Sequence, residues 1–188
     1  MPGPTPRISF SHFGLYTADL AKMEDFYTRF MGFTVTDRGA LEVLGGKVDL
    51  VFLSRDPREH HQIVLASGRP ADLPFNVVNQ LSFRVDRLAD LRALHERLQR
   101  EAVSEIRPIS HGNALSVYFR DPEGNRVELF VDTPWYVTQP LRIPFDFAQG
   151  DEALMRWVED TARKLPGFRP VAEWEREMAK KMARTPLS

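Results

Sequence analysis

The sequence contains no cysteine. This absence excludes disulfides, cysteine-based zinc sites, iron–sulfur clusters and a cysteine nucleophile, so a catalytic metal must be held by histidine, carboxylate, amide or hydroxyl groups. Long apolar runs are lacking as well, and none approaches the ~18 residues that a membrane helix needs. Residues 1–6 have neither a basic segment nor an apolar core. We therefore expect no signal peptide, no membrane association and a cytoplasmic location.

An excess of charge of either sign is also missing. The chain has 25 Lys and Arg against 26 Asp and Glu, a formal net charge of −1. Proteins that bind nucleic acid through bulk charge are markedly basic, so we expect no nucleic-acid partner. The 188 residues, 43% of them hydrophobic, match one ordinary globular domain with one sizeable core.

The chain contains an internal repeat with an offset of 68 residues. When His12 is placed over Gln80, the apolar positions of two expected helices coincide without a gap: Leu20 on Leu88, Phe26 on Leu94 and Phe30 on Leu98. Each half reads strand, helix, strand, strand, strand. An amphipathic helix in each half indicates a sheet with its helix packed on one face. Pairing the halves would curve the sheets around a shared cavity.

The pattern also predicts the individual elements. Asp19 is expected to cap the first helix, and Gly32 to end it. In the first half we expect strands over residues 8–16, 33–37, 48–54 and 62–66. In the second half we expect strands over residues 77–86, 103–109, 115–120 and 126–131, with a type I turn at 121–124. From Thr133 onward we expect a Pro-rich strap and two helices, at 151–165 and 171–184, which form a clasp on the core or a dimer contact.

Three polar residues stand in apolar strand patterns. His12 and its repeat mate Gln80 are expected in the middle of strands, at equivalent points of two paired sheets, so both would face one cavity. A structural, hydrogen-bonded histidine is the alternative for His12. Glu128 lies between Val127 and Leu129, where an unpaired carboxylate is costly to bury and a metal ion would offset the cost. A surface-facing glutamate is the alternative.

The combination of His12, Gln80, Glu128 and one residue of the window 60–62 is typical of a metal site. The layout resembles the vicinal oxygen chelate superfamily, which includes glyoxalase I, fosfomycin and bleomycin resistance proteins and extradiol catechol dioxygenases. The resemblance covers residues 7–132. It implies an α+β fold in which two tandem βαβββ modules, residues 7–70 and 71–132, form a curved mixed sheet around a central cavity. Residues 133–188 would then be a C-terminal helical extension.

Within that superfamily the chain is most similar to the extradiol ring-cleavage dioxygenases. Four segments carry this similarity: His12-Phe13-Gly14, residues 60–65, residues 111–118, and the turn and strand of residues 121–129. The resemblance implies that His12 and Glu128 bind the metal and that His61 is an acid/base histidine. It also implies that His111 lies in the active site and that Tyr118 binds substrate. The alternatives are a strand cap for His61, a turn role for His111 and a core position for Tyr118.

One residue departs from the family pattern. Extradiol enzymes use two histidines and one carboxylate, and Gln80 stands where the second histidine should be. An amide oxygen is a weaker donor to Fe(II) than imidazole. Three outcomes stay open: an iron site of reduced affinity, a site for Mn²⁺ or Zn²⁺, or no metal. His61 could also act as a fourth ligand, which would make the site similar to that of glyoxalase I.

The resemblance implies a reaction and its partners. A catechol-type aromatic diol would chelate the metal, most simply Fe(II), O₂ would bind beside it, and the ring would open next to the diol. The protein is expected to be a homodimer. The alternatives are a glyoxalase-like metal-dependent isomerase or lyase, and a non-catalytic small-molecule-binding protein of the resistance type.

Overall fold

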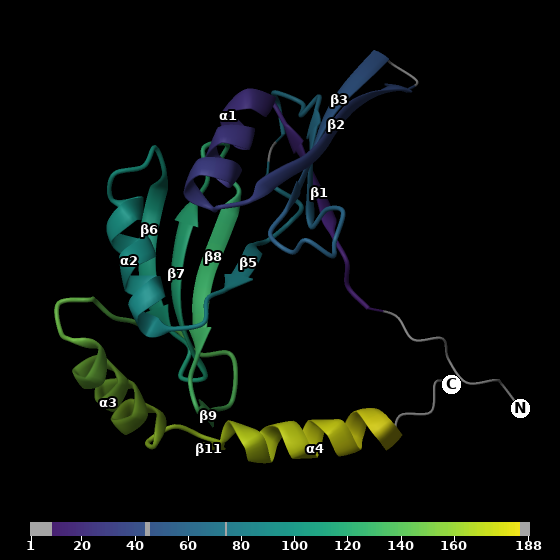
Figure 1. The fold of residues 1–188 in the computed structure, drawn as a ribbon. Helices are drawn as coiled ribbons and strands as arrows, with labels where there is room; N and C mark the ends of the chain where they lie inside the picture. Colours follow the sequence, from purple (N-terminus) through teal and green to yellow (C-terminus); the bar gives the residue numbers. More distant parts are fainter. Residues whose placement is uncertain (1–8, 44–45, 74, 185–188) are drawn as a thin grey trace, which may run out of the picture. The chain divides into compact units, whose positions relative to one another are not determined.

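The computed structural model describes residues 9–43, 46–73 and 75–184, and the chain divides into two compact units with the boundary between Val77 and Val78 in the sequence. The fold is α+β, as expected, with one βαβββ module in each unit and a C-terminal helical extension in the second. Each module has its own open sheet of parallel and antiparallel strands (Figure 1).

The first unit contains the strands β1 (Phe13–Thr17), β2 (Thr34–Val43), β3 (Gly46–Ser54) and β4 (Ile63–Ser67), in the sheet order β1-β4-β3-β2. β1 runs parallel to β4, and the other pairs are antiparallel. The helix α1 (Leu20–Asp25) connects β1 to β2, and it continues as a π-helical turn, η1 (Phe26–Phe30).

The start of α1 and its buried face agree with the sequence prediction. The carboxylate of Asp19 accepts a 3.0 Å hydrogen bond from the backbone N–H of Lys22, so one of the free N–H groups of the helix start is satisfied. Met23, Tyr27 and Phe30 are fully buried or nearly so. The π-helical turn was not expected. Phe26, Tyr27 and Phe30 are all buried in it, so the apolar stripe of α1 continues through this turn.

The second unit repeats this arrangement. Its strands are β5 (Leu81–Arg84), β6 (Ser104–Ser110), β7 (Ala114–Arg120) and β8 (Arg126–Asp132), with α2 (Leu88–Leu98) after β5. The sheet order is β10-β6-β7-β8-β5, with β5 parallel to β8. The added edge strand β10 (Ile143–Pro144) comes from the C-terminal strap and was not expected.

The offset of 68 residues holds at the start of both leading elements. β1 and β5 begin at Phe13 and Leu81, and α1 and α2 begin at Leu20 and Leu88. The turn at 121–124 forms as well, with a 2.9 Å hydrogen bond from the N–H of Gly124 to the carbonyl of Asp121. The internal repeat of the sequence is therefore a repeat of structure.

The two leading strands are shorter than expected, and this corrects the prediction for two residues. His12 and Gln80 do not lie in the middle of strands, because each directly precedes its strand and is exposed. The partner strands explain the difference. The pairing of β1 with β4 begins at Phe13 and Ile63, and the pairing of β5 with β8 begins at Leu81 and Val127, so His12 and Gln80 lie just outside these ladders.

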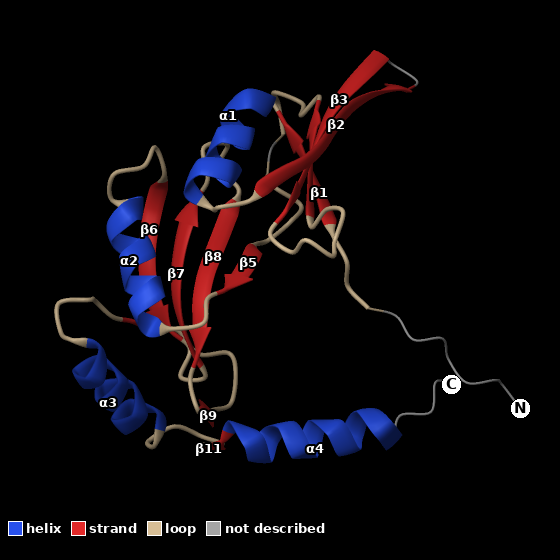
Figure 2. Ribbon diagram, in the orientation of Figure 1, coloured by secondary structure: helices blue, strands red, loops and turns tan. Residues whose placement is uncertain are grey.

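The C-terminal segment contains β9 (Trp135–Tyr136), α3 (Asp151–Ala162), β11 (Arg169–Pro170) and α4 (Val171–Arg184), with β9 paired to β11 (Figure 2). α3 buries Leu154, Val158 and Ala162. Arg92 of α2 donates to the carboxylate of Asp151 at 2.8 and 2.6 Å, so α3 is tied to the module. No helix among the described residues has the length and apolar character needed to span a membrane.

Candidate functional site

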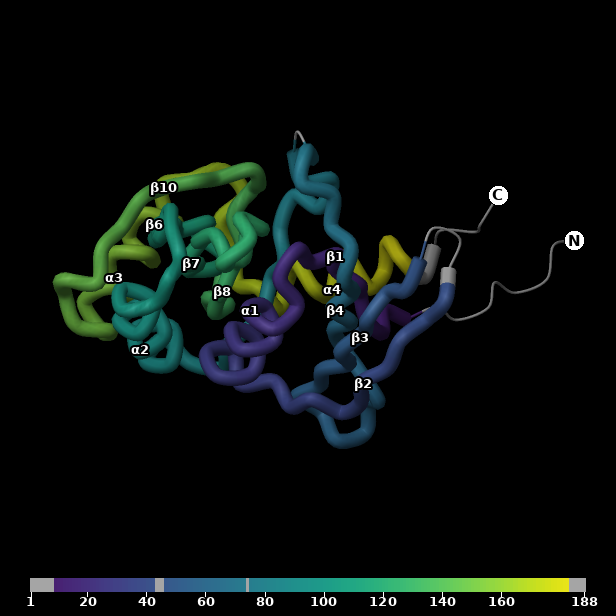
Figure 3. Tube along the Cα trace, turned by 90° about the horizontal axis from the view of Figure 1, so that it is seen from above, coloured from purple at the N-terminus to yellow at the C-terminus, as the bar shows by residue number. Residues whose placement is uncertain are grey.

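The sheet of the second unit has one apolar and one polar face. Along β7 and β8 the side chains alternate, and the residues of the apolar face are buried: Leu115, Val117, Phe119, Val127 and Leu129. α2 contacts β7 and β8 and lies along one side of the sheet (Figure 3). The opposite face carries the polar residues Ser116, Tyr118, Arg120, Arg126 and Glu128. The candidate site lies on this polar face.

Glu128 is the buried centre of the polar face, with 7% of its surface exposed. Its Oε2 atom accepts a 2.9 Å hydrogen bond from Nε2 of Gln80 and a short one from Oγ of Ser82. Its Oε1 atom accepts a 2.7 Å hydrogen bond from Oγ of Ser116. The surface-facing alternative for Glu128 is therefore wrong. Within the described residues, no lysine or arginine forms an ion pair with Glu128, so all three close donors are neutral.

His111 and Tyr118 form a hydrogen-bonded pair beside this carboxylate. Nδ1 of His111 lies 2.6 Å from the carbonyl oxygen of Leu141, and because a carbonyl only accepts, Nδ1 carries the proton. In the neutral ring Nε2 is then the acceptor, and the hydroxyl of Tyr118 donates to it at 2.9 Å. Nε2 of His111 lies 3.8 Å from Oε1 of Glu128.

The phenol of Tyr118 is held in its neutral form. Burial raises its pKa, and the neighbouring carboxylate of Glu128 raises it further because the phenolate would be repelled. Because its pKa is raised, Tyr118 is a hydrogen-bond donor at neutral pH.

The first unit brings together the histidines that the sequence singled out. The rings of His12 and His61 lie with their centroids 4.2 Å apart, and His61 also contacts Phe52 at 5.2 Å. Nδ1 of His60 lies 2.8 Å from Nδ1 of His61, whereas Nε2 of His60 lies 3.8 Å from the carboxylate of Asp37. Burial lowers the pKa of His61, and the nearby His12 and His60 lower it further. His61, rather than His60, is the ring beside His12.

The donor set of the polar face is compatible with a divalent metal. A carboxylate offers about four acceptor positions, and the three hydrogen bonds to Glu128 leave one for a cation. Nε2 of Gln80 donates to Ser82 and Glu128, whereas the amide oxygen accepts no hydrogen bond from the described residues, so the oxygen is available as a ligand. Over that same part of the chain, no three His, Asp or Glu side chains form a metal cluster by themselves, so an amide or hydroxyl donor would have to take part.

Three residues of the candidate site were missed by the sequence reasoning. Ser82 and Ser116 both donate to the carboxylate, and the backbone carbonyl of Leu141 orients His111. Ser82 could have been found, because it follows Gln80 by two positions on the same side of an alternating segment. Nothing in the local pattern distinguishes Leu141.

Comparisons with known proteins identify the family to which the chain belongs. The Glyoxalase/Bleomycin resistance protein/Dioxygenase superfamily model matches residues 9–129, and the chain belongs to this superfamily. Its curated relatives include biphenyl-2,3-diol 1,2-dioxygenase 3 of Rhodococcus globerulus, which is 31% identical over 181 residues, 89% of this chain and 80% of the relative. Biphenyl-2,3-diol 1,2-dioxygenase 2 of the same organism is 30% identical over 159 residues, 76% of this chain and 78% of the relative.

A solved structure shows the same fold. A glyoxylase/bleomycin resistance protein/dioxygenase domain from Frankia sp. EAN1pec superposes with a TM-score of 0.55 over 68% of this chain and 94% of its own, at 24% identity. The two relatives at about 30% identity are both named as biphenyl-2,3-diol dioxygenases.

Proposed function

We propose that this chain is a metal-dependent extradiol dioxygenase that opens the ring of a catechol-type aromatic diol with O₂. The observation that carries the proposal is the polar face of the second unit. There a buried carboxylate with only neutral close donors lies next to an oriented His111–Tyr118 pair. The names of the two Rhodococcus relatives support the same reaction class.

In this proposal the metal is held by His12, Gln80 and Glu128. Fe(II) is the metal we favour, with Mn(II) and Zn(II) as the other candidates. When bound, the metal supplies neighbouring positions for the diol and for O₂ and allows electrons to pass between them. The protein supplies one negative charge, from Glu128, and two neutral donors, one imidazole and one amide.

The remaining site residues position the substrate and move protons. Tyr118 and His111 form hydrogen bonds to the diol oxygens, and the Nδ1–H bond to Leu141 keeps Nε2 of His111 facing the site. His61 acts as the acid/base group through a ring nitrogen.

Gln80 also favours a second candidate function. An amide oxygen is a poorer iron ligand than imidazole, and a site of this composition suits a glyoxalase-like isomerase or lyase, or a binding protein without catalysis. Neither alternative consumes O₂, so oxygen uptake separates them from the dioxygenase. The proposal also includes a homodimer and a cytoplasmic location. Sedimentation of the purified protein tests the homodimer.

The test is oxygen consumption by protein that is purified without oxygen and loaded with Fe(II). We expect uptake with catechol or 2,3-dihydroxybiphenyl, together with the coloured ring-opened product. The same protein loaded with Zn(II) is the matched control, because zinc is not redox-active and should support no uptake. Absence of uptake from protein shown to contain iron would overturn the dioxygenase assignment for these substrates.

A further inference from the structure

A second group of charged side chains shares the polar face with Glu128 and has no role in the proposed chemistry. A pocket in the second unit is lined by four arginines, Arg107, Arg120, Arg126 and Arg142, together with Glu105 and Tyr118. We call this set the arginine pocket. Four arginines against one glutamate give its lining a formal charge of +3.

Most of this positive charge is not neutralised by the protein. Nε of Arg120 lies 3.2 Å from Oε2 of Glu105, so these two charges compensate each other. Among the described residues, no carboxylate pairs with Arg107, Arg126 or Arg142. The guanidinium of Arg142 lies over the ring of Tyr118, 5.5 Å from its centroid. Guanidinium groups left without partners around one hollow attract an anion, and their planar fork fits a carboxylate or a phosphate.

The strand register places the arginine pocket in line with the candidate site. Glu128 is paired with Ser82 on β5 and with Tyr118 on β7. Tyr118 is in turn paired with Arg107 on β6. Ser82, Glu128, Tyr118 and Arg107 therefore form one row across four neighbouring strands. At a strand spacing of ~4.8 Å, the backbone positions of Glu128 and Arg107 lie roughly 10 Å apart, with Tyr118 between them.

We propose that the arginine pocket binds a carboxylate group of the substrate, so that the preferred aromatic diol carries an acidic side chain. The inference rests on the proposed function only in placing the diol at Glu128. With the diol there and the ring beside Tyr118, the far end of the ring points along the row toward Arg107. A short acidic side chain at that end would reach the guanidinium groups, whereas a neutral substituent would leave them without a partner.

The test compares two ligands that differ by one carboxylate, 3,4-dihydroxyphenylacetate and 4-methylcatechol. Binding to the Fe(II)-loaded protein is measured by calorimetry in the absence of oxygen. We expect the acidic ligand to bind more tightly by on the order of tenfold to a hundredfold, the range of a charge-assisted hydrogen bond. This preference should weaken as salt is raised, because the arginines are partly exposed.

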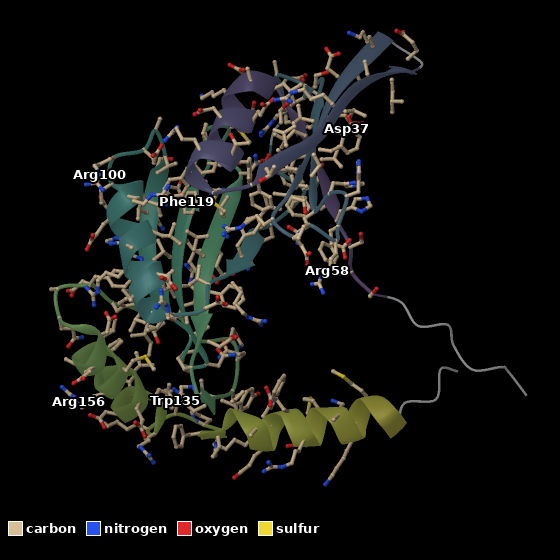
Figure 4. The ribbon with its side chains drawn as sticks, in the orientation of Figure 1. Asp37, Arg58, Arg100, Phe119, Trp135 and Arg156 are labelled. Atoms are coloured by element: carbon tan, nitrogen blue, oxygen red, sulfur yellow. The ribbon has the colours of Figure 1, made fainter. Side chains whose placement is uncertain are left out.

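Two variants locate the preference. Arg107→Gln and Arg126→Gln should each reduce it to within about threefold and leave the affinity for 4-methylcatechol unchanged, since only the charge-assisted contact is lost. The matched control is Arg100→Gln. Arg100 is exposed and follows α2, which covers the other face of the sheet (Figure 4). The control should keep the full preference.

Each outcome decides the inference separately from the proposed function. Equal affinity for the two ligands, or a preference that persists in both pocket variants, overturns the inference even if the protein consumes oxygen with neutral catechols. A pocket-dependent preference without any oxygen uptake supports the inference and overturns the dioxygenase assignment. If inorganic phosphate binds at the arginine pocket but the two catechols bind equally, the pocket holds a free anion and not a substrate carboxylate.

Discussion

Gln80 and Glu128, which are 48 positions apart in the sequence, are joined by a 2.9 Å hydrogen bond from Nε2 of Gln80 to Oε2 of Glu128. Because a carboxylate only accepts, this bond fixes the orientation of the amide and directs its oxygen away from Glu128. In the proposed metal site this orientation leaves the amide oxygen to bind the cation, while the amide nitrogen helps to hold the carboxylate. The five predictions below test the site and the packing that supports it.

Replacing Glu128 with alanine should abolish metal binding, because the only negative ligand of the proposed set is lost. Iron content after anaerobic Fe(II) loading should fall to background, while circular dichroism shows a folded protein. Glu152→Ala is the matched control, since Glu152 lies on α3 with 94% of its side chain exposed and should leave iron content unchanged. Iron retained by the Glu128 variant would mean that the ligands have been assigned wrongly.

Gln80→His should raise the affinity for Fe(II), because imidazole is the better donor to iron. We expect a gain on the order of tenfold, about 1.4 kcal/mol, with catechol-dependent oxygen uptake kept or increased. Adding Glu128→Ala to the Gln80→His protein should remove the gain. If the single variant binds iron more tightly yet neither it nor the wild type consumes oxygen, the chain is a glyoxalase-like or binding-only relative.

Tyr118→Phe should lower kcat/KM by about tenfold to a hundredfold, or about 1.4–2.7 kcal/mol of transition-state stabilisation, because Nε2 of His111 loses its donor and the substrate loses a contact. The free energy of unfolding should fall by only about 1 kcal/mol. Tyr16→Phe is the control, since Tyr16 is 63% exposed. Steady-state oxygen uptake at several substrate concentrations would measure both constants, and equal activity of the two variants would exclude Tyr118 from the site.

Gly112→Ala should destabilise the second unit by at least about 2 kcal/mol. Gly112 has φ = +73°, and a Cβ atom there would lie 2.5 Å from Cγ2 of Val137, so conformational strain and overpacking add together. Gly124→Ala is the control, because Gly124 has φ = +81° but open space around it. Only backbone strain acts there, so the free energy of unfolding should fall by about 1–2 kcal/mol. Chemical denaturation compares the two, and equal losses would show that Val137 moves aside freely.

The stability of the protein should depend on His95 at mildly acidic pH. Burial lowers the pKa of His95, whose ring packs on Phe147 with the centroids 4.7 Å apart. Near and below the ordinary pKa of about 6.5, the unfolded chain therefore binds more protons than the folded one. The contribution of neutral His95 to the free energy of unfolding is complete above that pH and is lost as the pH falls below it. His95→Gln should remove this component.

Urea denaturation of the wild type and the His95→Gln variant at about pH 8 and about pH 5.5 measures the effect. The wild type should lose more stability than the variant between these two values. Identical pH dependence of the two proteins would show that His95 titrates alike in the folded and unfolded chains.

The sequence by itself determined the architecture. The offset of 68 residues, the apolar stripes at helical spacing and the alternating strand segments identify two βαβββ modules, and the structure begins β1 and β5, as well as α1 and α2, at that offset. These features were accessible because helix and strand periods, caps and tight turns depend on residues that are neighbours in the chain. For the same reason Asp19 and the turn at 121–124 could be assigned correctly.

Only the tertiary structure decided which groups of the site are joined by hydrogen bonds. The hydrogen bonds from Ser82 and Ser116 to Glu128 depend on the register of β5, β8 and β7, and the contact of His111 with Leu141 joins residues 30 positions apart. The starts of the leading strands depend on where their pairing with β4 and β8 begins, and for this reason His12 and Gln80 lie outside the strands. Pairing between distant strands is set by the packing of whole faces, so local sequence patterns do not contain it.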